Sequence, residues 1–267
     1  MDGGSLVQAS SRRAGGNAGQ IDLNADMGES FGVYKLGQDE ALLGVVTSAN
    51  IACGFHAGDP TTMRVVVEQA LAAGVAIGAH PGLPDRVGFG RRELAITPEE
   101  AFDLTLYQVG ALHGVVRALG GQLRHVKPHG ALYNMAAARF DLASAIAEAV
   151  RRVDDQLILV GLAGSALVTA AHQASIAARS EVFADRRYRA DGSLVPRRQA
   201  GAVIEDPAEA VAQAVQMATA GVVKAEDGSR VPVAADTLCI HGDGSHAVTF
   251  AMQIRRALEE AGVRVVA

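Results

Sequence analysis

Acidic, basic and imidazole side chains follow several apolar runs of this sequence at the point where each run ends. Carboxylate, imidazole and ammonium groups are the side chains that exchange protons and stabilise charge in catalysis. A single position of this kind would be weak evidence, but five point to one shared pocket. The runs and the residues that follow them are 21–25 with Asp26, 46–53 with His56, 75–79 with His80, 123–126 with Lys127 and His129, and 238–240 with His241 and Asp243.

The first of these runs alternates polar and apolar residues. Asp22, Asn24 and Asp26 are spaced by two, so they share one face of a strand. Three polar groups on one face are costly to bury without partners. We therefore expect this face to look into a hydrated barrel or a hydrogen-bond network, with a solvated edge strand as the alternative.

The histidines and the lysine suggest proton transfer. His56 follows a glycine-rich turn and is a candidate general base or metal ligand. Lys127 and His129 are spaced by two, so they can share a face, stabilise developing negative charge and shuttle a proton. The predicted catalytic residues are Asp26, His56, His80, Lys127 and His129.

Arginines in the glycine-rich segment after the third run suit an anionic ligand, because a guanidinium group binds carboxylates and phosphates with two hydrogen bonds. An Asp-Arg pair follows the sixth run in the same way. A solvated turn is the alternative for these loops, and Asp243-Gly244 is also a turn signal. The predicted substrate- or phosphate-binding residues are Asn24, Arg86, Arg91, Asp185, Arg186 and Asp243.

A metal site is a second interpretation of the same side chains. Asp26, His56, His80 and His241 carry donor atoms that suit Zn²⁺ or Mn²⁺. No dense H-x-x-x-H spacing supports the set, so acid–base chemistry and metal binding both stay open. Cys53 precedes His56, and we interpret it as a small buried thiol in preference to a nucleophile.

Strand-like and helix-like segments alternate along the chain, which predicts an α/β fold of parallel strands with right-handed crossovers. About seven such units favour a distorted, TIM-like (β/α)7 barrel, whose chemistry lies at the C-terminal ends of the strands. The predicted strands are 20–26, 46–53, 75–80, 123–128, 157–161, 181–185 and 236–241. The predicted helices are 38–45, 60–73, 98–119, 131–151, 164–178, 207–219 and 245–261.

Three helix starts are marked by a capping side chain before a proline, at Asp59, Thr97 and Asp206. Glu100 and Glu209 would complete capping boxes at the last two. Two segments do not fit simple loops: 186–205 is a long polar excursion that suits a lid or partner surface, and 222–235 is a short β-excursion. We expect 20–267 to form one domain and 1–19 to form a disordered tail.

The composition excludes several functions. The formal net charge is −5 and no block of basic residues stands out, so nucleic acid is an unexpected partner. The N-terminus has no apolar segment of the secretory type, and no run of 18 apolar residues exists. These features predict a cytoplasmic protein without membrane association.

Five blocks of the sequence together resemble the LamB/YcsF family. They are IDLNADMGESFG at 21–32, ANIACGFHAGDP at 49–60, GAHP at 78–81, VKPHGALYN at 126–134 and EVFADR at 181–186. The resemblance runs from about residue 20 to the C-terminus. It implies a barrel of the glycoside hydrolase/deacetylase type, and it implies the first of three components of a 5-oxoprolinase that opens 5-oxo-L-proline to L-glutamate with ATP (as Mg-ATP), its partners being subunits B and C.

With that reaction in view, Asp26, His56 and His80 would position or deprotonate water, and Lys127 and His129 would stabilise the oxyanion or phosphate. Arginines would hold the substrate carboxylate. Two alternatives remain: a metal-dependent amidohydrolase or deacetylase that acts alone, and a non-catalytic subunit that binds the lactam. The sequence also leaves open whether a divalent metal is needed and whether the chain forms a homo-oligomer.

Overall fold

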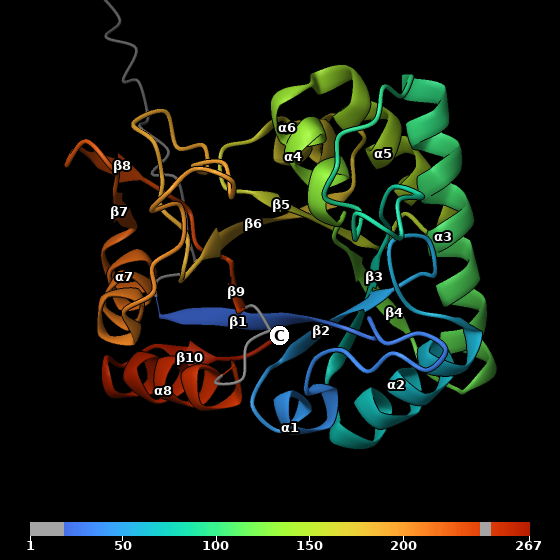
Figure 1. Cartoon of the computed structure of the whole chain (residues 1–267), viewed down its shortest axis with the longest axis horizontal. Helices are drawn as coiled ribbons and strands as arrows, with labels where there is room; N and C mark the ends of the chain where they lie inside the picture. The colour runs from blue at the N-terminus through green and yellow to red at the C-terminus, as the bar shows by residue number, and fades with distance from the viewer. Residues whose placement is uncertain (1–18, 241–246) are drawn as a thin grey trace, which may run out of the picture.

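The computed structural model describes residues 19–240 and 247–267. Within these ranges seven parallel strands close into a barrel, in the order β1, β2, β3, β4, β5, β6 and β9, and β9 pairs back with β1. The helices surround the strands (Figure 1). The predicted (β/α)7 barrel is therefore confirmed. No helix in the described part of the chain is long and apolar enough to cross a membrane.

The barrel strands are β1 (Gln20–Met27), β2 (Ser48–Ala52), β3 (Ala76–His80), β4 (Leu123–Val126), β5 (Ile158–Leu162), β6 (Ala177–Phe183) and β9 (Thr237–Ile240). The helices are α1 (Asp39–Leu43), α2 (Pro60–Ala73), α3 (Pro98–Ala118), α4 (Gly130–Ala138), α5 (Phe140–Val153), α6 (Ala166–Gln173), α7 (Pro207–Ala220) and α8 (Ala247–Glu260). Three short strands complete the list: β7 (Val222–Lys224), β8 (Arg230–Pro232) and β10 (Arg264–Val265).

The strand register sorts the side chains of β1 onto two faces. Leu23, Ala25 and Met27 are fully buried in the hydrophobic core between strands and helices. Asn24 and Asp26 alternate with them and lie level with Ser48 and Asn50 of β2. The polar face of β1 therefore looks into the barrel, as the spacing of its residues predicts.

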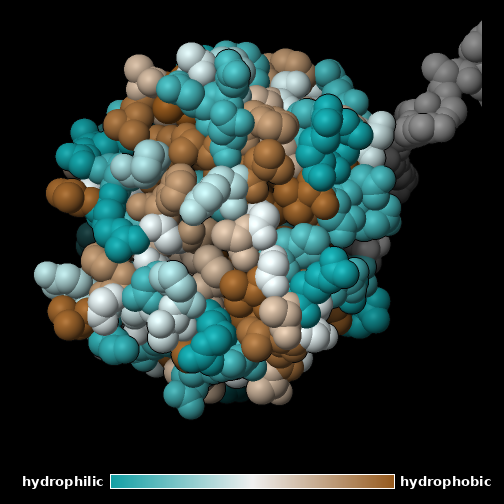
Figure 2. All heavy atoms as spheres, turned by 90° about the vertical axis from the view of Figure 1, so that its right-hand side faces the viewer, coloured by the Kyte–Doolittle hydropathy of each residue, from teal (hydrophilic) through white to brown (hydrophobic). Residues whose placement is uncertain are grey.

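Helix α3 covers the barrel with one side only. Its buried residues, among them Thr105, Val109, Leu112 and Val116, recur at three- and four-residue spacing. The face of the molecule that carries α3 mixes hydrophilic and hydrophobic residues (Figure 2), and Tyr107 is exposed there. The helix layer thus shields the strands and leaves the polar chemistry to the barrel end.

The predicted helix 131–151 is wrong as a single element, because α4 ends and α5 begins at Arg139. The backbone of Arg139 is extended, and the Arg139 guanidinium pairs with Asp141. Helix α5 packs along α3, whereas α4 packs against β5 as well as α5 and α6. These different neighbours require two helix directions, and no proline or glycine marks the break in the sequence.

The predicted helix 164–178 is also too long. Helix α6 ends at Gln173, Ser175 adopts a left-handed backbone with φ 59°, and β6 begins at Ala177. Glycine usually occupies such a left-handed position, so a serine there gave no signal for the helix end. Strand β10 pairs with the start of β1 and lies outside the predicted strands.

Two of the predicted caps have the expected partners in full. Asp59 accepts a hydrogen bond from the backbone N–H of Thr62, and Thr97 forms a reciprocal capping box with Glu100. Asp206 caps α7 through Ala208. The predicted second box is wrong, because the Glu209 carboxylate pairs with Arg187.

The two excursions pack against each other beside the barrel. Residues 222–232 form the expected hairpin of β7 and β8. In 186–205, Tyr188 is fully buried, bridges to Ala225, and accepts a hydrogen bond from the backbone N–H of Phe183 at 2.8 Å. This segment is anchored on β6; its predicted role as a lid or partner surface stays a prediction. Of residues 1–19, expected as a disordered tail, 1–18 lie outside the described residues.

Candidate active site

Polar side chains fill the barrel in layers, and the lowest layer is closed on itself. The Asp22 carboxylate accepts hydrogen bonds from the hydroxyls of Thr47, Ser48 and Thr237 at 2.6, 2.7 and 2.6 Å. Each hydroxyl satisfies part of a buried charge that would otherwise be costly. This layer therefore has a structural role and supports the site from below.

Asn24 occupies the next layer and supports the lysine above it. Its amide nitrogen donates to Thr237 at 2.6 Å, and its oxygen accepts from Asn50 at 2.8 Å and from the Lys127 ammonium at 3.1 Å. His125 bonds Asn50 at 2.8 Å and is buried. The amide of Asn24 is thus used within the barrel, and its predicted contact with substrate or phosphate stays a prediction.

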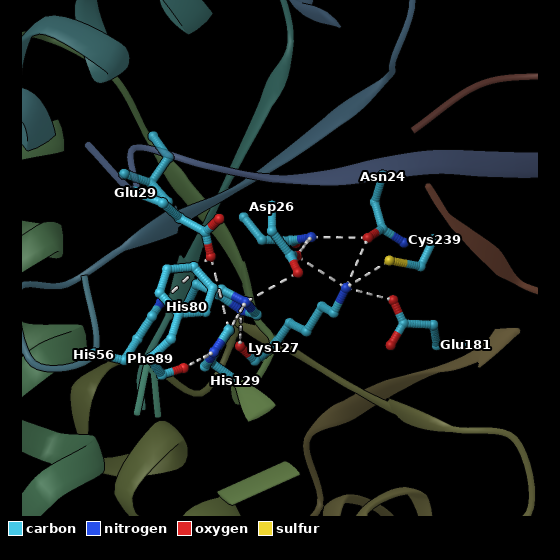
Figure 3. Close-up of polar contacts among 12 residues, drawn as sticks. Asn24, Asp26, Glu29, His56, His80, Phe89, Lys127, His129, Glu181 and Cys239 are labelled. Atoms are coloured by element: carbon cyan, nitrogen blue, oxygen red, sulfur yellow. Dashed lines mark hydrogen bonds and ion pairs between the residues drawn. The ribbon is translucent and has the colours of Figure 1, made fainter. Parts of the chain in front are cut away.

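The Lys127 ammonium is surrounded by acceptors on three strands (Figure 3). It lies 2.8 Å from Glu181 Oε1, and 3.1 Å from both Asp26 Oδ1 and Cys239 Sγ. Burial would lower the pKa of Lys127, but Asp26, Cys239 and Glu181 outweigh it and hold that pKa well above its usual value. An ammonium group has three protons, and these acceptors hold it in position; its predicted role on an oxyanion stays a prediction.

Asp26 links this buried cluster to the opening of the barrel. Its side chain is 18% exposed, while that of Lys127 is 5% exposed. Burial acts to raise the pKa of Asp26, but His80 and Lys127 lower it well below its usual value. Its Oδ2 lies 3.3 Å from His80 Nε2. Asp26 is thus a carboxylate held ionised at the pocket, which is the state that a proton acceptor requires.

His80 and His129 have their outer ring nitrogens fixed by backbone carbonyls. His80 Nδ1 lies 2.7 Å from the Lys127 carbonyl oxygen, and His129 Nε2 lies 2.8 Å from that of Phe89. A carbonyl oxygen only accepts, so both of these nitrogens carry hydrogen. The inner nitrogens, His80 Nε2 and His129 Nδ1, face each other at 2.9 Å.

His56 and Glu29 complete this end of the site. The His56 ring stacks on His129 at 3.7 Å with an angle of 2°, and His56 Nε2 lies 3.6 Å from Glu29 Oε1. Burial lowers the pKa of His56 well below its usual value and, with His80 nearby, lowers that of His129 to about 3. The His129 ring is therefore neutral at ordinary pH, and its predicted role on an oxyanion or phosphate stays a prediction.

The predicted anion-binding arginines of the third loop differ in their surroundings. Arg86 donates to the carbonyls of Gly54 and Gly58 and lies over the Phe31 ring at 4.8 Å, so it ties three loops together. Its predicted contact with substrate or phosphate stays a prediction. Arg91 is exposed and lies over the Phe89 ring at 4.9 Å, and its ligand role stays a prediction.

Arg186 is buried at the start of the 186–205 segment. It donates to the Val195 carbonyl at 2.6 Å, and its Nε has no hydrogen-bond partner among the described residues. Burial, together with Arg197, lowers its pKa to about 10. Arg186 and Asp185 stay predicted anion-site residues, while His241 and Asp243 lie outside the described residues.

The two thiols are buried and differ in their neighbours. Burial raises the pKa of Cys53 to about 12, and the pKa of Cys239 is also raised by burial despite the Lys127 ammonium. Neither thiol is ionised at neutral pH, so neither is an active nucleophile. Cys53 is the packed thiol that its context predicts.

Sequence reasoning missed two residues of the site. Glu181 was placed only as the start of a strand, yet it is fully buried against Lys127. Cys239 shares the inward face of β9 with Thr237, a spacing of two that could have identified it. Glu29, in the IDLNADMGESFG block, also belongs to the site, where it faces His56 and His129.

Comparisons with known proteins give the family of this chain. The LamB/YcsF family model matches residues 21–267. The chain is 58% identical to the 5-oxoprolinase A subunit of Bacillus subtilis (93% of this chain, 96% of that protein) and 56% identical to the protein of the same name from Brevibacillus brevis (92% and 97%). It also resembles the crystal structure of a lactam utilization protein from Thermus thermophilus, with 48% identity, a TM-score of 0.88, and coverage of 93% of this chain and 99% of that one. This chain belongs to the LamB/YcsF family.

Proposed function

We propose that this chain is the component of a three-part 5-oxoprolinase that opens the lactam. In this reaction 5-oxo-L-proline becomes L-glutamate while the complex hydrolyses ATP, supplied as Mg-ATP, with two further subunits, B and C. The observation that carries the proposal is the convergence of an ionised Asp26 and three buried imidazoles at the C-terminal end of the barrel, in a chain 56–58% identical to proteins that bear the 5-oxoprolinase name.

The chemistry of the ring explains why ATP is needed. A lactam is a resonance-stabilised amide, so direct attack by water is slow. Phosphorylation of the carbonyl oxygen activates the ring carbon, and addition of water gives a tetrahedral intermediate. Rupture of the C–N bond, with a proton delivered to nitrogen, opens the ring to an acyl phosphate. A second water hydrolyses this group, so that one ATP and two waters yield ADP, phosphate and glutamate.

In this proposal, one of the described residues accepts a proton in the ring opening, and the others hold charged groups in position. Asp26 accepts the proton of the attacking water, because it is the ionised carboxylate that reaches the opening. Lys127 keeps Asp26 ionised and fixes its position through the 3.1 Å contact. Arg91 and Arg186 are the proposed contacts for the substrate carboxylate or the phosphate.

Reconstitution tests this function directly. We expect lactam-dependent release of ADP and formation of glutamate when the chain is mixed with its partner subunits, and no glutamate from the chain alone. The measurement is coupled ADP detection together with chromatographic assay of glutamate. Opening of the lactam by the chain alone would remove the need for partners, and silence in every combination would reject the 5-oxoprolinase assignment.

The rim of the barrel mouth is the proposed docking surface for the partner that supplies the activated lactam. Val33 and Tyr34 follow β1, Val87 follows β3, and their exposures are 87%, 62% and 94%. Phe31 and Arg86 hold these two loops together. Exposed apolar side chains beside a pocket mark protein contacts, and here they surround the entrance that the activated lactam must cross.

Val87→Asp is therefore expected to weaken binding of the partner subunits by at least about tenfold, because a charge would be buried in the interface. Met252→Asp on α8 is the matched control, since Met252 is also exposed at 58% but lies on an outer helix. The measurement is the concentration of partner that gives half-maximal turnover. Equal effects of the two substitutions, or none, would place the interface elsewhere.

A further inference from the structure

Four donor atoms converge at the mouth of the barrel, from Glu29, His56, His80 and His129 (Figure 3). All four lie within 4.8 Å of one another. Three of the separations are 2.9 Å (His80 to His129), 3.6 Å (His56 to Glu29) and 3.9 Å (His129 to Glu29). A tetrahedral zinc ion with bonds of about 2.0–2.1 Å separates its ligand atoms by roughly 3.4 Å. The cluster has nearly these dimensions.

Two of the imidazoles present lone pairs to each other. Because His80 Nδ1 and His129 Nε2 donate to backbone carbonyls, the nitrogens that meet at 2.9 Å carry no hydrogen when the rings are neutral. Two such lone pairs repel unless a positive centre lies beside both. Backbone carbonyls that fix the outer nitrogen are also the usual second partners of histidines that bind a metal.

His56 adds an independent observation. Its side chain is completely buried, and neither ring nitrogen has a hydrogen-bond partner within the described residues. Buried polar atoms almost always have partners, so this ring calls for one. The ring is oriented by stacking on His129, and its Nε2 lies nearest to Glu29. A cation between these groups would satisfy it.

The formal charge around the four donor atoms is negative, which suits a cation. Asp26, Glu29 and Glu181 carry three negative charges, and Lys127 and the nearby Arg91 carry two positive charges, so these five residues sum to −1. A carboxylate excess of this kind at a buried site favours a divalent cation.

We infer that Glu29, His56, His80 and His129 form a binding site for one divalent transition-metal ion, and that Zn²⁺ suits this donor set best. Imidazole and carboxylate donors favour zinc and its neighbours in the first transition row over Mg²⁺ or Ca²⁺. This set shares His56 and His80 with the ligands that the sequence suggested and adds Glu29 and His129, while His241 lies outside the described residues. When bound, such an ion polarises a carbonyl or phosphoryl oxygen.

Metal binding by the isolated chain tests the inference without ATP, lactam or partner subunits. The chain is stripped with a chelator, titrated with Zn²⁺ by calorimetry, and assayed for bound metal by elemental analysis. We expect about one zinc per chain and a higher melting temperature with zinc, because a ligand that binds only the folded state stabilises it. His129→Ala and Glu29→Gln should each weaken zinc binding at least about 10–100-fold, as loss of a ligand exceeds loss of its outer support.

The matched control is His172→Ala, an exposed histidine on α6 that should leave zinc binding unchanged. Glu29 is only half-buried, so Glu29→Gln keeps the test valid if His129→Ala does not fold. Failure of the stripped chain to bind zinc, or unchanged binding in Glu29→Gln, would overturn the site. Loss of binding in His172→Ala would place the metal elsewhere and also overturn it. The outcome is independent of the 5-oxoprolinase assay.

Discussion

Asp26→Asn is expected to reduce glutamate formation by the reconstituted complex by about 10²–10⁴-fold, the usual contribution of a positioned general base. The substitution removes the negative charge and the proton affinity of Asp26, the carboxylate that, among the described residues, joins the Lys127 cluster to the opening. The measurement is the turnover rate at saturating lactam and ATP, with binding of the partner subunits checked separately.

The variant should still fold, because an asparagine fits the hydrogen bonds of Asp26. Its oxygen can accept from Lys127 and Asn50, as Oδ1 does at 3.1 and 3.0 Å. Its amide nitrogen would take the place of Oδ2 and face Nε2 of His80, 3.3 Å away. A loss of turnover in a folded Asp26→Asn variant would then reflect a lost chemical step and not a lost fold.

Asp59→Asn is the matched control for this experiment. Asp59 follows β2 at the same end of the barrel and caps α2, and asparagine is as good a cap as aspartate. Turnover of this variant should stay close to that of the unsubstituted chain. If Asp26→Asn behaved in the same way as Asp59→Asn, Asp26 would not be the base.

The sequence predicts the end of the barrel that holds the site, because that inference depends only on local patterns. Asn24 and Asp26 alternate with buried Leu23 and Ala25, and this period of two places them inside any barrel. His80 and Lys127 end neighbouring strands, so a parallel sheet brings them together without further information.

What the sequence could not predict are contacts between distant residues. The partners of Lys127 include Cys239, 112 positions away, and Glu181 on another strand. The local pattern showed a lysine beside a histidine and could not show that its protons are already used. Arg86 likewise looked like a free guanidinium, while the fold brings two carbonyls to it.

The cluster around Lys127 and the histidine cluster above it are linked through Asp26. One oxygen of this carboxylate meets the Lys127 ammonium, and the other meets His80, which belongs to the histidine cluster. Removing charge from the Lys127 cluster must therefore change the electrostatic potential at the histidine cluster. This coupling makes the lysine important for stability as well as for activity.

Lys127→Met is expected to lower the free energy of unfolding by about 3–5 kcal/mol, the cost of leaving a buried charge without its partner. Methionine keeps the length and the apolar stem but removes the ammonium, so Glu181, which is 0% exposed, loses its ion pair. The measurement is urea unfolding followed by circular dichroism. Lys224→Met in the exposed β7 position is the control and should change stability little.

A double substitution identifies the cause of this loss. Adding Glu181→Gln to Lys127→Met should recover about 0.5–3 kcal/mol, because it removes the buried charge that has lost its ion pair. If Glu181→Gln gave no relief, Lys127 would stabilise the barrel by packing and not through its charge.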